Sequence, residues 1–266
     1  YSIGCPFRCG FCNATSRRVY RLRAPEKIVA DLDNVVRRSG VMRFHMLSHL
    51  LNGDSRHLDE LLTRLESANL KIFWSDCCRP AGIGADTLAR MRRVGASVLV
   101  WGIDCGSERL SRLMNKGVHH DSALGILKAS HRAGIRNVVN IIIGMPHENE
   151  QDIEETLRFI DRAKPYVHRF ETPTYLFHHE SLLARSPERY GLVPGADGGV
   201  DEPSGLSWKQ RTARMPDLAR RMAARDPLMR GYDPRGRLTR ALTGPLLSPL
   251  WARIRAAKRA RSPTSG

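Results

Sequence analysis

Three cysteines lie close together near the start of the chain, in the string Cys5-Pro-Phe-Arg-Cys9-Gly-Phe-Cys12. Thiolates this close on one loop can converge on a soft metal centre, and Gly10 lets the backbone fold around it. A structural zinc or an electron-transfer cluster uses a fourth protein ligand, whereas a catalytic site keeps one position open for substrate or cofactor. The spacing therefore predicts a metal centre with an open position.

Other interpretations of the cysteines stay open. His45 and His49 could complete a zinc site, and disulfides or a plain reduced loop are further alternatives. The remaining cysteines, Cys77, Cys78 and Cys105, lack the spacing of the first three. We expect them to be buried thiols near strand ends, with a reactive or second-cluster role as the alternative.

The hydrophobic periodicity alternates between the strand and helix patterns. A short strand ends at Gly4, and further strands are expected near residues 42–47, 70–74, 96–104, 135–143 and 168–177. Helices are expected at about 25–38, 55–67, 86–94 and 149–163, with helical stretches between 107 and 133. This alternation implies right-handed crossovers and a parallel sheet. We expect an α/β fold, a partial (β/α)6 TIM-type barrel, with an open doubly wound sheet as the alternative. In both, ligands bind at the carboxyl ends of the strands.

The pattern divides the chain into three parts: a catalytic barrel at 1–192, a loop and accessory helix at 193–225, and a poorly ordered basic tail at 226–266. The net charge of +16 belongs mostly to the end of the chain, because 15 of the 43 basic residues but only three of the 27 acidic ones follow residue 207. These arginines are interleaved with Ala, Pro and Gly rather than with aromatics, which argues against a nucleic-acid partner.

The N-terminus carries no signal pattern, and no apolar run is long enough to span a membrane. We therefore expect a cytoplasmic protein with no membrane association. The chain starts without methionine, and its first strand is very short. We expect the barrel to be N-terminally truncated.

The string GCPFRCGFCN resembles the cluster motif of the radical S-adenosylmethionine (SAM) superfamily, in which an aromatic residue, here Phe11, precedes the last cysteine. The resemblance runs from Tyr1 to about Leu192. It implies that Cys5, Cys9 and Cys12 hold three irons of a [4Fe-4S] cluster and that SAM chelates the fourth. It also implies reductive cleavage of SAM to methionine and a 5′-deoxyadenosyl radical, with ferredoxin or flavodoxin as the electron donor.

Two later strand ends are similar to cofactor-binding stretches of this family. The segment 102–108 resembles a G-I-E-S-G-S stretch whose glutamate contacts the ribose, and Asp104 stands at that place. Its alternative role is a helix cap. The segment 143–148 is similar to an I-x-G-x-P-x-E stretch that lines the adenine with backbone atoms, here including Gly144. Asn140, on the same strand, is either a core amide or a further cofactor contact.

Two more residues are candidates by their position. Asn52 lies in a turn after the second expected strand, where the superfamily binds the amine of the methionyl group, and it could contact that cation. Arg79, after the third strand, could bind the methionyl carboxylate in a bidentate manner or be a surface arginine.

Three strings resemble the catalytic half of enzymes that carry a cobalamin-binding domain before the barrel: 19–26, 114–117 and 186–192. Many of those enzymes are methyltransferases. The resemblance implies a small-molecule or peptide substrate, and any cobalamin is expected to be bound by a domain outside this chain. A tRNA methylthiotransferase-like enzyme and a non-catalytic metal-binding barrel are the alternatives.

Overall fold

The computed structural model of the chain describes residues 1–15, 19–196, 198–203, 205–225 and 229–231. Within these limits, residues 1–231 form one compact unit. The basic tail expected at 226–266 lies outside the described residues, apart from a short strand at 229–231. None of the described helices is long and apolar enough to cross a membrane.

A parallel sheet forms the framework, as the alternation of elements predicts. Its strands are hydrogen-bonded in the order β10-β7-β6-β5-β4-β3, and every pairing is parallel. The bounds are β3 Arg43–His45, β4 Phe73–Cys78, β5 Ala96–Asp104, β6 Arg136–Ile141, β7 Arg169–Thr172 and β10 Met229–Gly231. Chain order and spatial order agree across the sheet, as in a barrel segment, whereas a doubly wound sheet reverses its order at a switch point.

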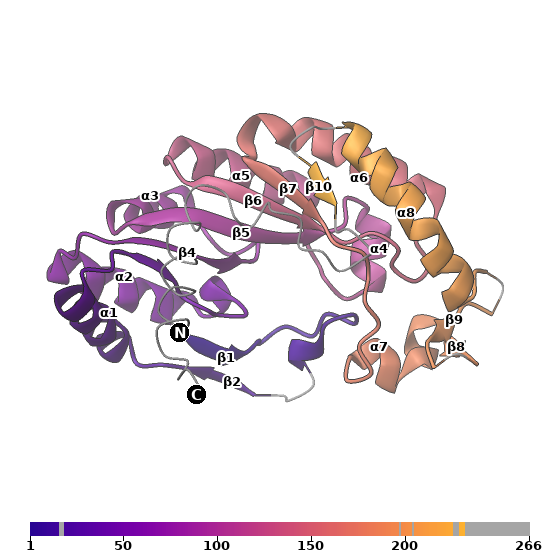
Figure 1. Cartoon of the computed structure of the whole chain (residues 1–266), viewed down its shortest axis with the longest axis horizontal. Coiled ribbons are helices and arrows are strands. Elements are labelled where there is room, and N and C mark those ends of the chain that lie inside the picture. The colour runs from indigo at the N-terminus through magenta and orange to yellow at the C-terminus, as the bar shows by residue number, and fades with distance from the viewer. Residues whose placement is uncertain (16–18, 197, 204, 226–228, 232–266) are drawn as a thin grey trace, which may run out of the picture. The chain divides into compact units, whose positions relative to one another are not determined.

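The helices form one layer on one face of this sheet (Figure 1). Consecutive helices contact each other in turn: α1 with α2, α2 with α3, α3 with α5, α5 with α6, and α6 with α8. Their bounds are α1 Pro25–Ser39, α2 Ser55–Ala68, α3 Ala85–Arg93, α5 His120–Arg132, α6 Glu150–Ala163 and α8 Trp208–Arg225, whereas the short helix α4, Glu108–Leu113, is not in this series of contacts. The structure is therefore a partial barrel with its helices outside, and the open-sheet alternative is excluded.

The register shows which strand residues face the helices. The Trp101 indole of β5 donates a hydrogen bond to Asn137 of β6 at 2.8 Å, and the Asn137 amide donates to the Leu127 carbonyl of α5 at 2.9 Å. Because side chains alternate along a strand, Val100, Gly102 and Asn140 face the opposite, concave side.

Local signals explain where the helices begin and end. Pro25 occupies the first turn of α1, and Gly40 ends that helix in the left-handed conformation, with φ of 67°. Asn149 and Asp152 form a reciprocal capping box at the start of α6. These caps, with the apolar stripes, account for helix limits within about two residues of those expected.

The first strand differs from the expectation. β1, Ser2–Gly4, does not join the parallel sheet but pairs antiparallel with β2, Tyr20–Leu22, a strand that the periodicity did not predict. Gly4 makes the close approach possible, since a Cβ there would lie 1.7 Å from the Val19 carbonyl oxygen. The ribbon reaches the end of β3 through the Tyr1 ammonium, which lies 3.4 Å from the Met46 carbonyl oxygen.

Two other strands have different limits. The third expected strand, 70–74, is found at β4, 73–78, where its polar second half includes Asp76. That buried carboxylate is satisfied by the Ser48 amide at 3.1 Å and by the Ser48 hydroxyl at 2.5 Å. The sixth, expected at 168–177, ends at Thr172, because Pro173 follows and cannot donate to the ladder. Beyond it come α7 Leu182–Arg185 and the hairpin of β8 Val193–Pro194 and β9 Val200–Asp201.

The segment after β5 approaches α6 closely at Gly106. Its amide donates to the Thr156 hydroxyl at 3.0 Å, and a Cβ at Gly106 would lie 2.4 Å from the Thr156 Cα. Gly125, in α5, has open space around its Cα. The two glycines thus offer a matched comparison of packing against helix propensity.

We expect Gly106→Ala to lower the free energy of unfolding by about 1–3 kcal/mol, because the new methyl group must push α6 away from the sheet. Gly125→Ala should raise it by about 0.5–1 kcal/mol through helix propensity. Anaerobic urea unfolding of both variants measures the difference. Equal effects would contradict the close packing at residue 106.

Candidate functional site

The cysteine loop is held between two distant parts of the chain. The Gly10 amide donates to the Met114 carbonyl at 2.7 Å, and the Leu183 amide donates to the Gly10 carbonyl at 2.9 Å. The Asn115 side chain donates to the Arg8 carbonyl at 2.7 Å. Residues from the end of α4 and from α7 therefore fix the loop near the carboxyl end of β5.

The three thiols lie in one electrostatic environment. Cys9 is buried, while Cys5 and Cys12 are half-buried. Burial raises the pKa of the Cys5 and Cys12 thiols, and the neighbouring Cys9 thiolate adds to this effect. On Cys5, the cations of Lys116 and Arg79 act in the opposite direction and favour the thiolate.

Three thiols on one loop suit a soft metal centre such as an iron–sulfur cluster. Among the residues that the structure describes, no three His, Cys, Asp or Glu side chains are gathered closely enough to be identified as a metal site. The Nδ1 atom of His45 lies 3.0 Å from the Ser75 hydroxyl. Cysteines that each bind a different iron can lie further apart than the ligands of one zinc ion.

Arg79 is one of two cations beside these thiols. It is only 8% exposed, so it is not a surface arginine. Its guanidinium donates to the Lys116 carbonyl and to the Gly117 carbonyl, the latter at 3.2 Å, and lies 4.0 Å from the Cys9 sulfur. The same group stacks over the Phe7 ring, 4.1 Å from its centroid.

Lys116 is the second cation. Its ammonium lies 2.5 Å from the Asp104 carboxylate, and both side chains are about 11% exposed. Burial lowers the Lys116 pKa, but the Asp104 carboxylate and the Cys9 thiolate outweigh burial and raise it. Asn115 and Gly117 on either side have φ of 51° and 59°, a tight turn that aims Lys116 inward. Lys116 therefore stays charged at the carboxyl ends of the strands, which we call the mouth of the barrel.

Asp104 is held in a strained backbone conformation, with φ of 69°. It does not cap the following helix, because the side chain that accepts from α4 is Ser107, at 3.4 Å from the Leu110 amide. Strain of this kind gathers at functional sites. Among the described residues, its ion-pair partner is Lys116.

Asn52 has a different surrounding from the one expected. Its carbonyl oxygen accepts from the Arg79 amide at 2.9 Å, and its amide group donates to the Arg79 and Ala81 carbonyls, both at 2.9 Å. These contacts tie the turn after β3 to the loop after β4. The arrangement makes Asn52 a support for Arg79.

The remaining candidates lie around the carboxyl ends of β5 and β6. Asn140 pairs in register with Gly102, and its buried side-chain oxygen has no hydrogen-bond partner among the described residues. Gly144 has φ of 80°, and its amide donates to the Glu148 carboxylate at 2.6 Å. Phe11 packs against the smaller apolar cluster that includes Cys105 and Met114. The geometry thus brings Asp104, Asn140 and the cysteine loop to one end of the barrel.

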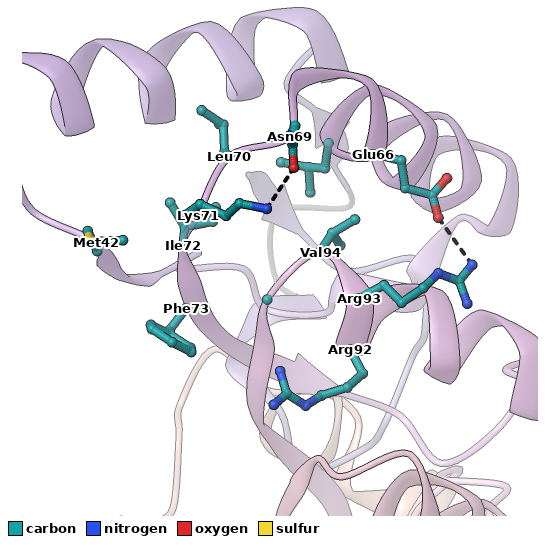
Figure 2. A pocket seen from close by; sticks show the side chains of 12 residues that line it. Met42, Glu66, Asn69, Leu70, Lys71, Ile72, Phe73, Arg92, Arg93 and Val94 are labelled. Atoms are coloured by element: carbon teal, nitrogen blue, oxygen red, sulfur yellow. Dashed lines mark hydrogen bonds and ion pairs between the residues drawn. The ribbon is translucent and has the colours of Figure 1, made fainter.

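A pocket of about 400 Å³ lies elsewhere (Figure 2). It is lined by residues that precede or begin β4 and β5, such as Lys71, Phe73 and Gly95. At its rim Lys71 donates to Asn69, and Arg93 pairs with Glu66 (Figure 2). The amino ends of parallel strands lie opposite the catalytic face of a barrel, so this pocket is not the site described above.

Comparison with known proteins decides the family. Residues 1–160 match the sequence profile of the radical SAM superfamily. The chain belongs to this superfamily.

The individual relatives share only about a quarter of their residues with this chain over the matched segments. The chain is 22% identical over 160 residues to an uncharacterized methyltransferase, PH0819, of Pyrococcus horikoshii, covering 59% of this chain and 35% of the relative. It is 26% identical over 213 residues to a tRNA-2-methylthio-N(6)-dimethylallyladenosine synthase of Clavibacter sepedonicus, covering 72% and 40%. The chain thus spans well under half the length of these relatives.

A solved structure supports the fold. The radical SAM methyltransferase TsrM of Kitasatospora setae, with cobalamin and a [4Fe-4S] cluster bound, superposes with a TM-score of 0.58 at 15% identity. The match covers 69% of this chain and 37% of that one. At this identity the likeness shows the fold alone.

Lys116 and Glu148 lie around the site, but the sequence patterns do not predict a role for them. Lys116 lies inside the string 114–117, where its signal is a lysine beside a glycine, directly after a short helix. The signal for Glu148 is its place at the end of the I-x-G-x-P-x-E stretch.

Glu148 is a buried acid behind the β6 loop. Burial raises its pKa from 4.5 to about 7, although the Gly144 amide and Arg211 act in the opposite direction. A raised folded-state pKa means that the unfolded chain loses its proton first as pH rises. The folded state is therefore penalised progressively between about pH 4.5 and 7.

We expect Glu148→Gln to remove this penalty while keeping an oxygen for the Gly144 amide. Relative to wild type, the variant should gain stability as pH rises from 4.5 to 7, by up to about 3 kcal/mol. Urea unfolding at several pH values measures the difference. A difference that stays constant across the range would show that the Glu148 pKa is the same in the folded and unfolded states.

Proposed function

We propose that this chain is the catalytic part of a radical SAM enzyme that cleaves SAM reductively at a [4Fe-4S] cluster held by Cys5, Cys9 and Cys12. The observation that carries the proposal is a loop of three thiols set beside two buried cations, Arg79 and Lys116. When bound, the cluster and SAM supply methionine and a 5′-deoxyadenosyl radical, with one electron from a donor such as ferredoxin or flavodoxin.

The residues around the carboxyl ends of the strands would orient SAM and neutralise its charged groups. Arg79 offers its cation to the methionyl carboxylate, while its contacts to the 116–117 carbonyls limit its movement. Asp104 accepts from the ribose hydroxyls, and Lys116 fixes the direction of that carboxylate. The unpartnered Asn140 oxygen takes a further hydroxyl. Gly144 lines the adenine with backbone atoms, and Phe11 shields the cysteine loop.

The substrate is proposed to lie on the concave face of the sheet. Asn140 of β6 pairs in register with Glu171 of β7, whose carboxylate lies 2.5 Å from Arg169. The Arg169 Nε is buried and has no hydrogen-bond partner in the part of the chain that the structure describes. A buried donor without a partner is costly, so a small-molecule or peptide substrate with a carbonyl or carboxylate group suits this face.

A cobalamin-dependent methyltransferase is the subfamily that we favour. Its support is the named methyltransferase relative and the fold shared with TsrM, whose structure holds cobalamin. The corrinoid is assigned to a part of the enzyme outside this chain. A tRNA methylthiotransferase-like enzyme is the second candidate, because that relative matches a larger share of the chain, 72%.

We expect anaerobically reconstituted wild-type protein to bind about four irons and four sulfides per chain. Cys5→Ala, Cys9→Ala and Cys12→Ala should each abolish the cluster, since each removes the only protein ligand of one iron. Iron and sulfide assays with visible absorption measure the content. Cys77→Ala and Cys105→Ala are the matched controls and should retain the cluster. Stoichiometric zinc without visible absorption would contradict the proposal.

With dithionite and SAM, the loaded protein should release 5′-deoxyadenosine. Asp104→Asn should weaken SAM binding by about 1–3 kcal/mol, because the ribose loses a charged acceptor. Equilibrium dialysis measures the affinity, and Asp121→Asn, an exposed acid paired with Arg162, is the control. Unchanged affinity in Asp104→Asn would mean that this carboxylate serves Lys116 alone.

A further inference from the structure

Residues after position 160, which lie outside the family match, contact the loop that follows β6. Arg211, on α8, is only 3% exposed, and it donates to the Met145 carbonyl at 2.6 Å. It also forms an ion pair with Glu202. The Glu202 carboxylate in turn accepts from the His147 amide at 2.8 Å. Arg211 and Glu202 together therefore hold two backbone positions of the segment 144–148.

The backbone of this loop adopts conformations that are not favourable by themselves. Gly144 and His147 have φ of 80° and 61°, both in the left-handed region, which is unfavourable for His147. A Cβ at Gly144 would lie 2.8 Å from the end of the Met215 side chain, so α8 packs directly against this glycine. The loop shape thus depends on contacts from outside it.

Arg211 is not required to attach α8 to the sheet. Leu218 and Met222 of that helix belong to the main core, and Met215 belongs to the smaller apolar cluster. Apolar burial on this scale anchors a helix without the arginine. Burying the guanidinium also has a cost, since desolvation lowers the Arg211 pKa to about 10. A buried charge that the helix does not need calls for another role.

We propose that Arg211 is a positioning residue for SAM: it fixes the backbone of 144–148, against which the adenine packs. The inference rests on the proposed function, because it assigns that loop to the cofactor. It adds that cofactor affinity depends on a residue of α8, outside residues 1–160 that match the family. Arg211 acts through the loop and touches no reacting atom.

The test compares SAM binding and turnover in cluster-loaded wild type, Arg211→Met and Arg211→Lys. Arg211→Met should raise the Kd and KM for SAM about 10- to 100-fold, as expected for lost hydrogen bonds to a charged group. The kcat for 5′-deoxyadenosine release at saturating SAM should stay within about twofold, since the arginine holds no reacting group. Arg211→Lys keeps the charge and should recover part of the affinity.

Arg221→Met is the matched control on the same helix. It removes an exposed ion pair with Glu150 and should leave the Kd for SAM unchanged. Iron content and the unfolding midpoint, measured for every variant, separate a positioning role from general damage. An Arg211→Met protein that loses kcat and affinity together, or neither, would overturn the inference. If Arg211→Met does not fold, the Kd for SAM is measured in Glu202→Gln instead, which weakens the link between Arg211 and the loop. An unchanged Kd in Glu202→Gln would then overturn the inference.

The two proposals fail in different ways. Wild type that loads a cluster but binds no SAM would refute the proposed function, and the role of Arg211 with it. Wild type that binds SAM while Arg211→Met binds it equally well would refute only the role of Arg211.

Discussion

The buried ion pair between Lys116 and Asp104 is the interaction on which the mouth of the barrel depends. Either charge alone in this place would be strongly unfavourable, so each requires the other. The pair also explains the local backbone, since Asp104 and the residues beside Lys116 adopt left-handed conformations that bring the two side chains together. Through the Lys116 carbonyl the pair is joined to Arg79, and through Arg79 to Cys9.

The cysteine loop is therefore connected to the end of β5 by charged side chains as well as by backbone hydrogen bonds. The loop precedes the first described helix, yet its amides and carbonyls bond to residues near 114 and 183. The β6 loop is held in a similar way by α8 and the β8–β9 hairpin. Both loops are thus held in shape by segments far away in the chain.

Short sequence patterns predicted those features of the fold that depend on residues close together in the chain. The helices, the strand β5 and the cysteine motif follow from periodicity, caps and spacing, and the structure contains them with small shifts. The pairing of β1 with β2 was not predictable, because it depends on a glycine that lets two backbones meet. Asn52 and Lys116 have roles set by partners at least 12 residues away, and Arg211 by partners 9 and 66 residues away. No local pattern encodes such contacts.

The sheet ends at β3, a strand of only three residues, two of them the exposed Arg43 and His45. An outer strand offers its unpaired amides and carbonyls to any other extended chain, which is how sheets of separate molecules fuse. A strand this short with basic side chains at both ends offers a poor template. The β3 edge therefore gives little opportunity for strand pairing between molecules.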